Sequence, residues 1–221
     1  MAKIPRKGRD RTPFAAPSKT RSKNPPYYKD RQPEPPEPEP VVYKKVKVPN
    51  KTSLFDLVMA TRRYDAKRVE RTQYIDIEIS NIIPYFGTSS ILFTAKSLSG
   101  TTAAKYPTVI AFYNIEFIDG EDNWKRGMLK FENPETNAIV VCKQPDYRHS
   151  PVRVYCACPD FYFTFAYPDF NKQCYYGKKP KPYKRVMPPS NYPPKNPNNI
   201  PGLCKHQLNM INLLIKQGYV K

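Results

Sequence analysis

Six short segments between residues 74 and 158 alternate apolar and polar side chains, and this pattern constrains the fold of the chain most strongly. The segments are YIDIEIS, SILFTAKSL, PTVIAFYNIEFI, RGMLKFE, AIVVCKQ and VRVYCAC, and they are separated by Gly, Asn, Asp and Pro. A period of two is typical of half-buried strands. The pattern therefore predicts a mainly β fold, with an antiparallel sheet, sandwich or small barrel over residues 74–158.

Proline is concentrated on both sides of this β region. Residues 1–50 contain 11 of the 26 prolines together with 13 Lys or Arg, 5 acidic residues and few large aliphatic side chains. Such a segment cannot bury enough apolar surface to offset its ordering entropy. We expect a long extended N-terminal arm, with a short polyproline II rod at PEPPEPEP (33–40). The arm is either a solvated tail or a segment that other molecules hold in place.

Residues 51–73 are expected to form a short helix and a connector. Thr52 or Ser53 is suited to cap the N-terminus of this helix. Its predicted apolar face carries Leu54, Phe55, Val58 and Met59.

Residues 159–221 are expected to form a Pro- and Tyr-rich flap followed by a C-terminal helix. Ten prolines lie between Pro159 and Pro201, which predicts a long irregular loop after Phe170. The final helix is expected from about Cys204 to Gln217, with Gly218 ending it. Its apolar stripe comprises Leu208, Ile211, Leu214 and Ile215.

Four residues at the two ends of this flap have the spacing of a metal site. Cys156 and Cys158 end the last predicted strand, and Cys204 and His206 begin the last helix, with 45 residues between the two pairs. Three thiolates and one imidazole are a complete tetrahedral ligand set for structural Zn²⁺. Closing the loop costs about 3–4 kcal/mol of chain entropy, whereas a structural zinc site contributes roughly 10–16 kcal/mol. We therefore expect zinc to fix the C-terminal helix to the sheet.

The geometry of a helix adds one condition to this interpretation. Positions two apart on a helix point about 200° away from each other, so Cys204 and His206 share a metal only if Cys204 precedes the first turn. Gly202 is expected to allow the bend that this requires. Asp160 is expected to accept a hydrogen bond from His206 or to cap the turn that follows Cys158.

Other interpretations of the cysteines remain open at this stage. The ligand cysteines are alternatively reduced structural thiols or, less favoured in a reducing compartment, members of a disulfide. Cys142 lies on a predicted strand and is expected to be a small buried apolar residue. Cys174 is an alternative ligand or thiol partner, and its role is left open. His149 is expected in a surface loop.

The charge of the chain indicates its class of partner. An excess of 37 Lys and Arg over 19 Asp and Glu gives a net charge of +18, which favours nucleic acid, an acidic partner or a crowded assembly. No apolar stretch is long enough to span a membrane, and the first residues lack the apolar core of a signal peptide, so we expect a protein of a reducing cytosol without a membrane. Because no phosphate-binding loop or catalytic triad is visible, we expect no enzyme activity.

The ligand pattern resembles a known family. Cys-x-Cys followed at a distance by Cys-x-His at a helix start is similar to the SWIM-type zinc finger, over residues 152–217. This resemblance implies a strand-strand-helix module that contacts DNA or protein, although the gap of 45 residues is longer than usual for the family. CACPDFYFTFAY paired with NIPGLCKHQLNMINLL, behind a β-rich region and a basic arm, also resembles virion structural proteins of large tailed bacteriophages.

The second resemblance implies a non-enzymatic structural component of a phage virion, in the capsid, neck, tail or baseplate. Its arm would tie neighbouring subunits together in a symmetric multi-copy assembly with other virion proteins, formed in the host cytoplasm. The alternative is a SWIM-type, zinc-containing protein that binds DNA or RNA without sequence specificity. The arm residues expected to contact subunits or nucleic acid are Arg6, Lys7, Arg9, Arg11, Lys19, Arg21, Lys23, Tyr27 and Tyr28.

Overall fold

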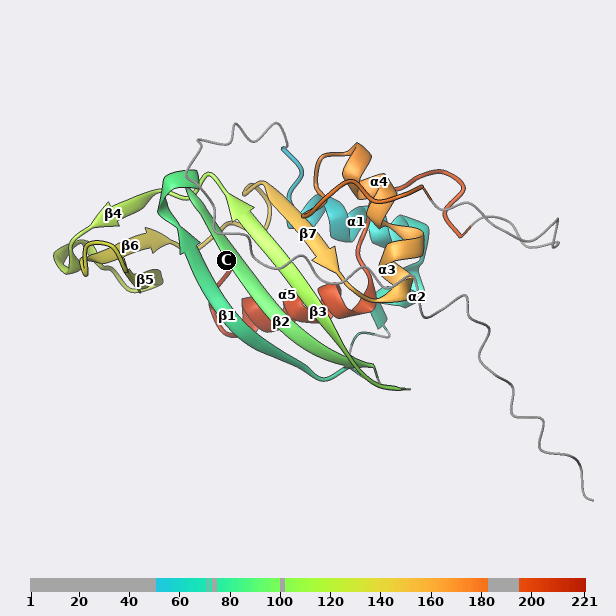
Figure 1. Cartoon of the computed structure of the whole chain (residues 1–221), viewed down its shortest axis with the longest axis horizontal. Helices are drawn as coiled ribbons and strands as arrows, with labels where there is room; N and C mark the ends of the chain where they lie inside the picture. Colours follow the sequence, from blue (N-terminus) through green and yellow to red (C-terminus); the bar gives the residue numbers. More distant parts are fainter. Residues whose placement is uncertain (1–50, 71, 73–74, 100–101, 183–194) are drawn as a thin grey trace, which may run out of the picture. The chain divides into compact units, whose positions relative to one another are not determined.

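The computed structural model describes residues 51–70, 72, 75–99, 102–182 and 195–221, and side chains in the same ranges except at 98, 99 and 102–104 (Figure 1). These residues form a mainly β structure with two antiparallel sheets and a C-terminal helix, as the sequence predicts. The expected arm, its PEPPEPEP rod and its nine predicted contact residues lie outside the described residues.

The larger sheet has four antiparallel strands. They are β1 (Ile77–Tyr85), β2 (Ser90–Ser99), β3 (Thr102–Tyr113) and β7 (Val152–Cys156), in the order β1-β2-β3-β7. The alternation in these segments places one set of side chains in the core between the sheet and α5. Within that core, the rings of Phe93 and Phe112 meet edge to face, with centroids 5.8 Å apart.

The smaller sheet has three strands in the order β4-β6-β5. They are β4 (Phe117–Asp119), β5 (Met128–Glu132) and β6 (Ile139–Lys143). The sequence pattern predicted one strand over 107–118, but the structure divides it between the two sheets. The break falls at Asn114, whose φ of 59° is a left-handed conformation that a strand cannot contain.

Two helices precede the first sheet: α1 (Leu54–Tyr64) and α2 (Ala66–Glu70). Ser53 caps α1 in a capping box with Asp56, in agreement with the sequence analysis. The buried face of α1 differs in part from the expected one. It comprises Leu54, Leu57, Val58 and Thr61.

Phe55 lies at the side of α1 and not on its buried face. Its ring packs edge to face against Tyr147, and the Arg148 guanidinium lies over it at 4.6 Å from the ring centroid. Met59 is also only half-buried. These contacts explain why Phe55 is apolar without belonging to the core face.

The segment after β7 is more ordered than its composition indicates. It begins with two short helices, α3 (Pro159–Thr164) and α4 (Ala166–Asn171), which the sequence analysis did not predict. Cys158 is the N-cap of α3, and Pro159 occupies the first helical position, where its missing N–H costs nothing. Aromatic side chains fill both helices, so no 3.6-residue polar and apolar alternation marks them.

The C-terminal helix α5 (Lys205–Lys216) lies along one face of the larger sheet and contacts β1, β3 and β7 (Figure 1). Gly218, with a φ of 73°, ends the helix as expected. Of the predicted stripe, Leu208, Ile211 and Leu214 are buried, while Ile215 is 44% exposed. No described helix is long and apolar enough to cross a membrane.

Candidate metal centre

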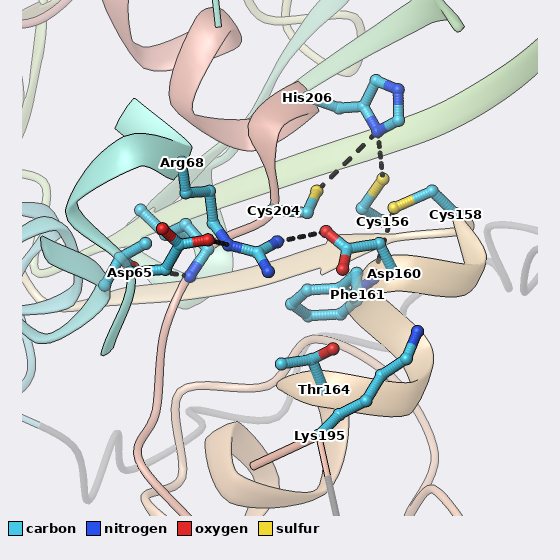
Figure 2. Close-up of polar contacts among 12 residues, drawn as sticks. Asp65, Arg68, Cys156, Cys158, Asp160, Phe161, Thr164, Lys195, Cys204 and His206 are labelled. Atoms are coloured by element: carbon cyan, nitrogen blue, oxygen red, sulfur yellow. Dashed lines mark hydrogen bonds and ion pairs between the residues drawn. The ribbon is translucent and has the colours of Figure 1, made fainter. Parts of the chain in front are cut away.

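The ends of three elements meet beside the core of the larger sheet (Figure 2). Cys156 is the last residue of β7, and Cys158 is the N-cap of α3, two residues later. Cys204 is the N-cap of α5, and His206 lies in the first turn of that helix. Cys204 therefore precedes the first turn, which is the condition the sequence analysis set for a shared metal.

The four side chains converge on one point. Their nearest ligand atoms all lie within 4.8 Å of one another. Nδ1 of His206 is 3.8 Å from the Cys156 sulfur and 3.9 Å from the Cys204 sulfur. A tetrahedron with bonds of about 2.3 Å has edges of about 3.8 Å. The two His206 distances match this edge, and small shifts of the side chains would bring all four atoms around one ion.

All four side chains are enclosed by protein. Cys156, Cys158, Cys204 and His206 are at most 2% exposed. The imidazole of His206 lies against Tyr106, with ring centroids 5.1 Å apart. Its Nε2 is buried and has no hydrogen-bond partner among the described residues, which leaves Nδ1 as the nitrogen that faces the sulfurs.

Hydrogen bonds hold the sulfurs in place. The backbone N–H of Phe161 donates to the Cys158 sulfur at 3.3 Å, and the Thr108 hydroxyl donates to the Cys156 sulfur at 3.5 Å. The N–H of Cys204 donates to Oε1 of Gln207 at 2.9 Å. The first two donors stabilise thiolate at Cys158 and Cys156. The third bond does not touch a sulfur, and it fixes the backbone of Cys204 at the start of α5.

The three thiols differ in acidity. Burial raises the pKa of Cys156 and of Cys204 well above the usual value. Hydrogen bonds from the Cys156 and Cys204 thiols hold the pKa of Cys158 well below it. The cluster thus favours one thiolate on its own, and only a bound cation would make three adjacent buried thiolates favourable.

Asp160 does not hydrogen-bond to His206, contrary to the first role expected for it. Its carboxylate instead accepts a hydrogen bond from the Arg68 guanidinium of α2 and lies in the first turn of α3 (Figure 2). The Arg68 guanidinium also lies over the ring of Phe165, at 5.1 Å from its centroid. Asp160 thus links α3 to α2, while the neighbouring Cys158 faces the cluster.

The remaining cysteines and the second histidine lie outside the cluster. Cys142 is fully buried on β6, as expected, and burial raises its pKa to about 12. Cys174 is also buried, and its thiol donates to the carbonyl oxygen of Asp169 at 3.4 Å, so it is not a ligand here. His149 is exposed and pairs with Asp146 at 3.0 Å. All five cysteines are free thiols.

The sequence analysis missed the residues that position the approach to Cys204. Asp169 of α4 is fully buried, and its carboxylate accepts the Gly202 N–H at 2.8 Å. The hydroxyl of Thr61 in α1 accepts the Leu203 N–H at 2.8 Å. These contacts join residues 33 and 142 positions apart, and no local sequence pattern could reveal them.

Gly202 has a different role from the one expected. Its φ is not in the left-handed region, so it is not required for the bend. A Cβ at this position would lie 2.7 Å from Cε1 of Phe165 and 2.9 Å from the Thr61 hydroxyl oxygen. Glycine is needed because the chain passes directly against these two side chains.

The cluster of Cys156, Cys158, Cys204 and His206 is therefore a closed, buried group of four ligands able to bind a metal ion. Comparisons with protein-family models, with curated proteins and with solved structures found no match for this chain.

Proposed function

We propose that this protein is a non-enzymatic structural component of a phage virion. In this proposal a structural zinc ion fixes α5 to the end of β7, and the basic N-terminal arm ties neighbouring subunits together. The observation that supports it most directly is the buried group of four ligands, whose members come from the ends of β7, α3 and α5.

The donor set favours zinc among the common metals. Three sulfurs and one imidazole nitrogen suit a borderline-soft ion that prefers four tetrahedral ligands. Calcium and magnesium prefer oxygen ligands, and iron–sulfur clusters are usually held by four cysteines. The two pairs Cys156/Cys158 and Cys204/His206 would make a SWIM-like module, with α3 and α4 inserted between its halves.

A structural role for the metal follows from burial. A catalytic zinc keeps one position open for water or substrate, with three protein ligands. Here four protein ligands fill the coordination sphere, and each of them is at most 2% exposed. Such an ion has no position for a reacting group, so its contribution is to stability.

The virion assignment rests on the two sequence stretches that carry the resemblance. CACPDFYFTFAY comprises the end of β7, α3 and the start of α4, and NIPGLCKHQLNMINLL leads into α5. Both stretches therefore belong to the metal centre. We place the protein in the virion with other virion proteins, in a symmetric multi-copy assembly formed in the host cytoplasm.

Metal analysis of purified protein tests the zinc part of this proposal. We expect about one zinc per chain in the wild type and in a Cys142→Ala control, which removes a buried thiol outside the cluster. Cys204→Ala and His206→Ala should lose most of the metal. A metal-free wild type, or a Cys204→Ala variant with full zinc content, would refute the site.

Mass spectrometry that compares purified phage particles with the free cytosolic fraction tests the virion part of the proposal. The protein must be enriched in the particles, and a protein found only in the cytosolic fraction would contradict the virion assignment.

The net charge of +18 supports a second candidate, a SWIM-type protein that binds DNA or RNA without sequence specificity. Neutralising phosphates by Lys and Arg makes such binding steeply salt-dependent. A gel shift with duplex DNA and with RNA, repeated from about 50 to 200 mM salt, distinguishes the candidates. A strong shift that disappears over this range favours nucleic-acid binding, whereas no shift at any salt concentration favours the structural role.

A further inference from the structure

The two edge strands of the larger sheet, β7 and β1, differ in whether further backbone segments pair with them. At one edge, β7 is covered: its Val152 N–H donates to the Thr52 carbonyl, and Val154 exchanges backbone hydrogen bonds with the segment Cys174–Tyr176. At the other edge, β1 pairs with β2 and with no other described strand. An uncovered edge strand presents unpaired N–H and C=O groups to any strand that approaches it.

A groove runs along this open edge. It lies between β1 and the C-terminal part of α5 and has a volume of about 420 Å³. Its walls combine backbone with partly buried apolar side chains. They include Ile77, Ile79 and Ile82 of β1, with Leu213 and Tyr219 from the α5 side. The groove thus offers both backbone groups and apolar contacts to an added strand.

Two features of β1 limit how many of its residues could pair with an added strand. The pairing with β2 is irregular between Ile79 and Asn81, and Pro84 lacks an N–H near the far end of the strand. The edge therefore has two regular stretches, Ile77–Ile79 and Asn81–Ile83, and Glu78 lies in the first. Glu78 is exposed there, and Asp76 just before it is exposed as well.

One stretch of the arm has the composition of a matching strand. VVYKKVKV (41–48) contains four valines and a tyrosine, and Pro49 follows it. In an extended conformation one face would carry Val42, Lys44, Val46 and Val48, and the other would carry Val41, Tyr43, Lys45 and Lys47. Lys45 and Lys47 would complement Glu78 and Asp76, while the three valines of the first face would suit the apolar groove.

The order of the sheet prevents residues 41–48 of a chain from pairing in full with that chain's own β1 edge. Thr52 lies one strand spacing outside β7, and a strand added to β1 would lie one spacing outside the opposite edge. Five spacings of about 4.8 Å separate them, or about 24 Å. The four residues from Val48 to Thr52 span at most about 14 Å.

We propose that residues 41–48 of one copy add as a strand to the β1 edge of a second copy. This inference rests on the proposed function, because it names the surface through which the arm would tie subunits together. Because each copy carries one arm segment and one open β1 edge, the contact is of the head-to-tail kind. Head-to-tail contacts generate a ring or a filament unless two copies exchange arms reciprocally, and the multi-copy assembly proposed above requires a ring or a filament.

Cross-linking between two different single variants tests the contact directly. Lys47→Cys and Glu78→Cys full-length chains are mixed and oxidised mildly, and the mixture should give a disulfide-linked dimer of one chain of each kind. A mixture of Lys47→Cys with Glu132→Cys is the matched control, because Glu132 is an exposed acidic residue on a strand of the other sheet. No cross-link with Glu78→Cys, or equal yields in both mixtures, would overturn the proposal.

A backbone variant separates this inference from the proposed function. Val46→Pro removes one backbone donor from the segment, whereas the control Val46→Thr keeps it. We expect the wild type and Val46→Thr to self-associate in light scattering, and Val46→Pro to remain monomeric with unchanged zinc content. If Val46→Pro associates like the wild type, or the wild type is monomeric at every concentration, the strand addition is wrong. A wild type without zinc would instead count against the metal centre and leave the strand addition to be judged by the association data.

Discussion

Asp169 is the most unusual single residue in the core, because a carboxyl group is fully buried there. Its carboxylate accepts the N–H of Gly202, while its Oδ2 has no hydrogen-bond partner among the described residues. Burial raises the pKa of Asp169 well above its usual 3.8, and the Gly202 hydrogen bond lowers it by less. The folded protein therefore holds a proton at Asp169 that the unfolded chain releases above about pH 4.

This proton makes stability depend on pH in a defined direction. Between the unfolded pKa and the raised folded pKa the native state binds more protons, so the free energy of unfolding falls as pH rises. We expect a contribution of up to about 1.4 kcal/mol per pH unit over that window. In Asp169→Asn this slope should be absent. Urea unfolding of the wild type and of Asp169→Asn from pH 4 to 8 measures this slope. The difference in the free energy of unfolding between the two proteins at each pH cancels the contribution of other titrating groups. If this difference stays constant with pH, Asp169 does not hold the proton.

Gly202 gives a second prediction at this scale. Gly202→Ala would place a methyl group 2.7 Å from Cε1 of Phe165, so either the ring or the backbone must shift. We expect a loss of about 1–3 kcal/mol in the free energy of unfolding, typical of an overpacked core. Denaturant unfolding measures this loss, and a double-mutant cycle with Phe165→Leu should show partial recovery. Purely additive effects would indicate that the clash is not with Phe165.

The four ligand residues of the site could be predicted from the sequence, but the residues that position them could not. Three cysteines and a histidine in two short motifs define a ligand set from sequence because their chemistry is specific to metals. Gly202, Asp169 and Arg68 are common residue types, and their importance depends on neighbours distant in sequence. Asp160 illustrates the limit: its place next to Cys158 indicated His206 as a partner, whereas Arg68, 92 residues away, is the partner found.

At the scale of elements, strands and helices with a regular apolar pattern were predicted, whereas elements that depend on tertiary contacts were not. The bounds of β2, β5, β6, β7 and α5 were predicted to within two residues from alternation and from a 3.6-residue stripe. β1 ends five residues later than predicted, and the segment predicted as one strand over 107–118 is divided between β3 and β4. Helices α3 and α4 were missed because CPDFYFTFAYPDFN is aromatic on all sides and contains Pro168. Two of its rings, Phe161 and Phe165, are fully buried in the core, and Phe161 stacks on Tyr175 beyond the segment, with centroids 6.2 Å apart. These tertiary contacts, which the local sequence does not reveal, accompany the helical conformation.

The attachment of α5 is the prediction that belongs to this scale. Its N-cap is Cys204 and its first turn carries His206, so removing the proposed zinc would leave the helix held mainly by its apolar face. We expect a chelator such as phenanthroline to increase amide hydrogen exchange of residues 205–216 at least tenfold. The β2–β3 pair should change much less. The Cys142→Ala variant serves as a control without altered ligands, and equal exchange in α5 before and after chelation would contradict the role of the metal.

At the scale of the whole molecule, the described core is built from residues after 50, and residues 1–50 carry a strong positive charge. The described residues bury a continuous cluster drawn from α1, the larger sheet, α3 and α5. Residues 1–50, which lie outside the described residues, contribute 13 basic and 5 acidic side chains, which is +8 of the net charge of +18. In the proposed function, the described core supplies stability and residues 1–50 supply the contacts to neighbouring subunits.

Deleting residues 1–50 tests this division. Because the core is made from residues after 50, the truncated chain should keep its zinc content and should unfold cooperatively within about 5 °C of the full-length protein. Self-association should be lost, because the arm segment that reaches the neighbouring β1 edge is gone while the edge remains. Adding a synthetic peptide of residues 40–50 should then occupy the vacated edge and inhibit association of the full-length chain. A truncated protein that still assembles, measured by light scattering at the same concentration, would mean that the contacts between copies lie within residues 51–221 and that the arm has another task.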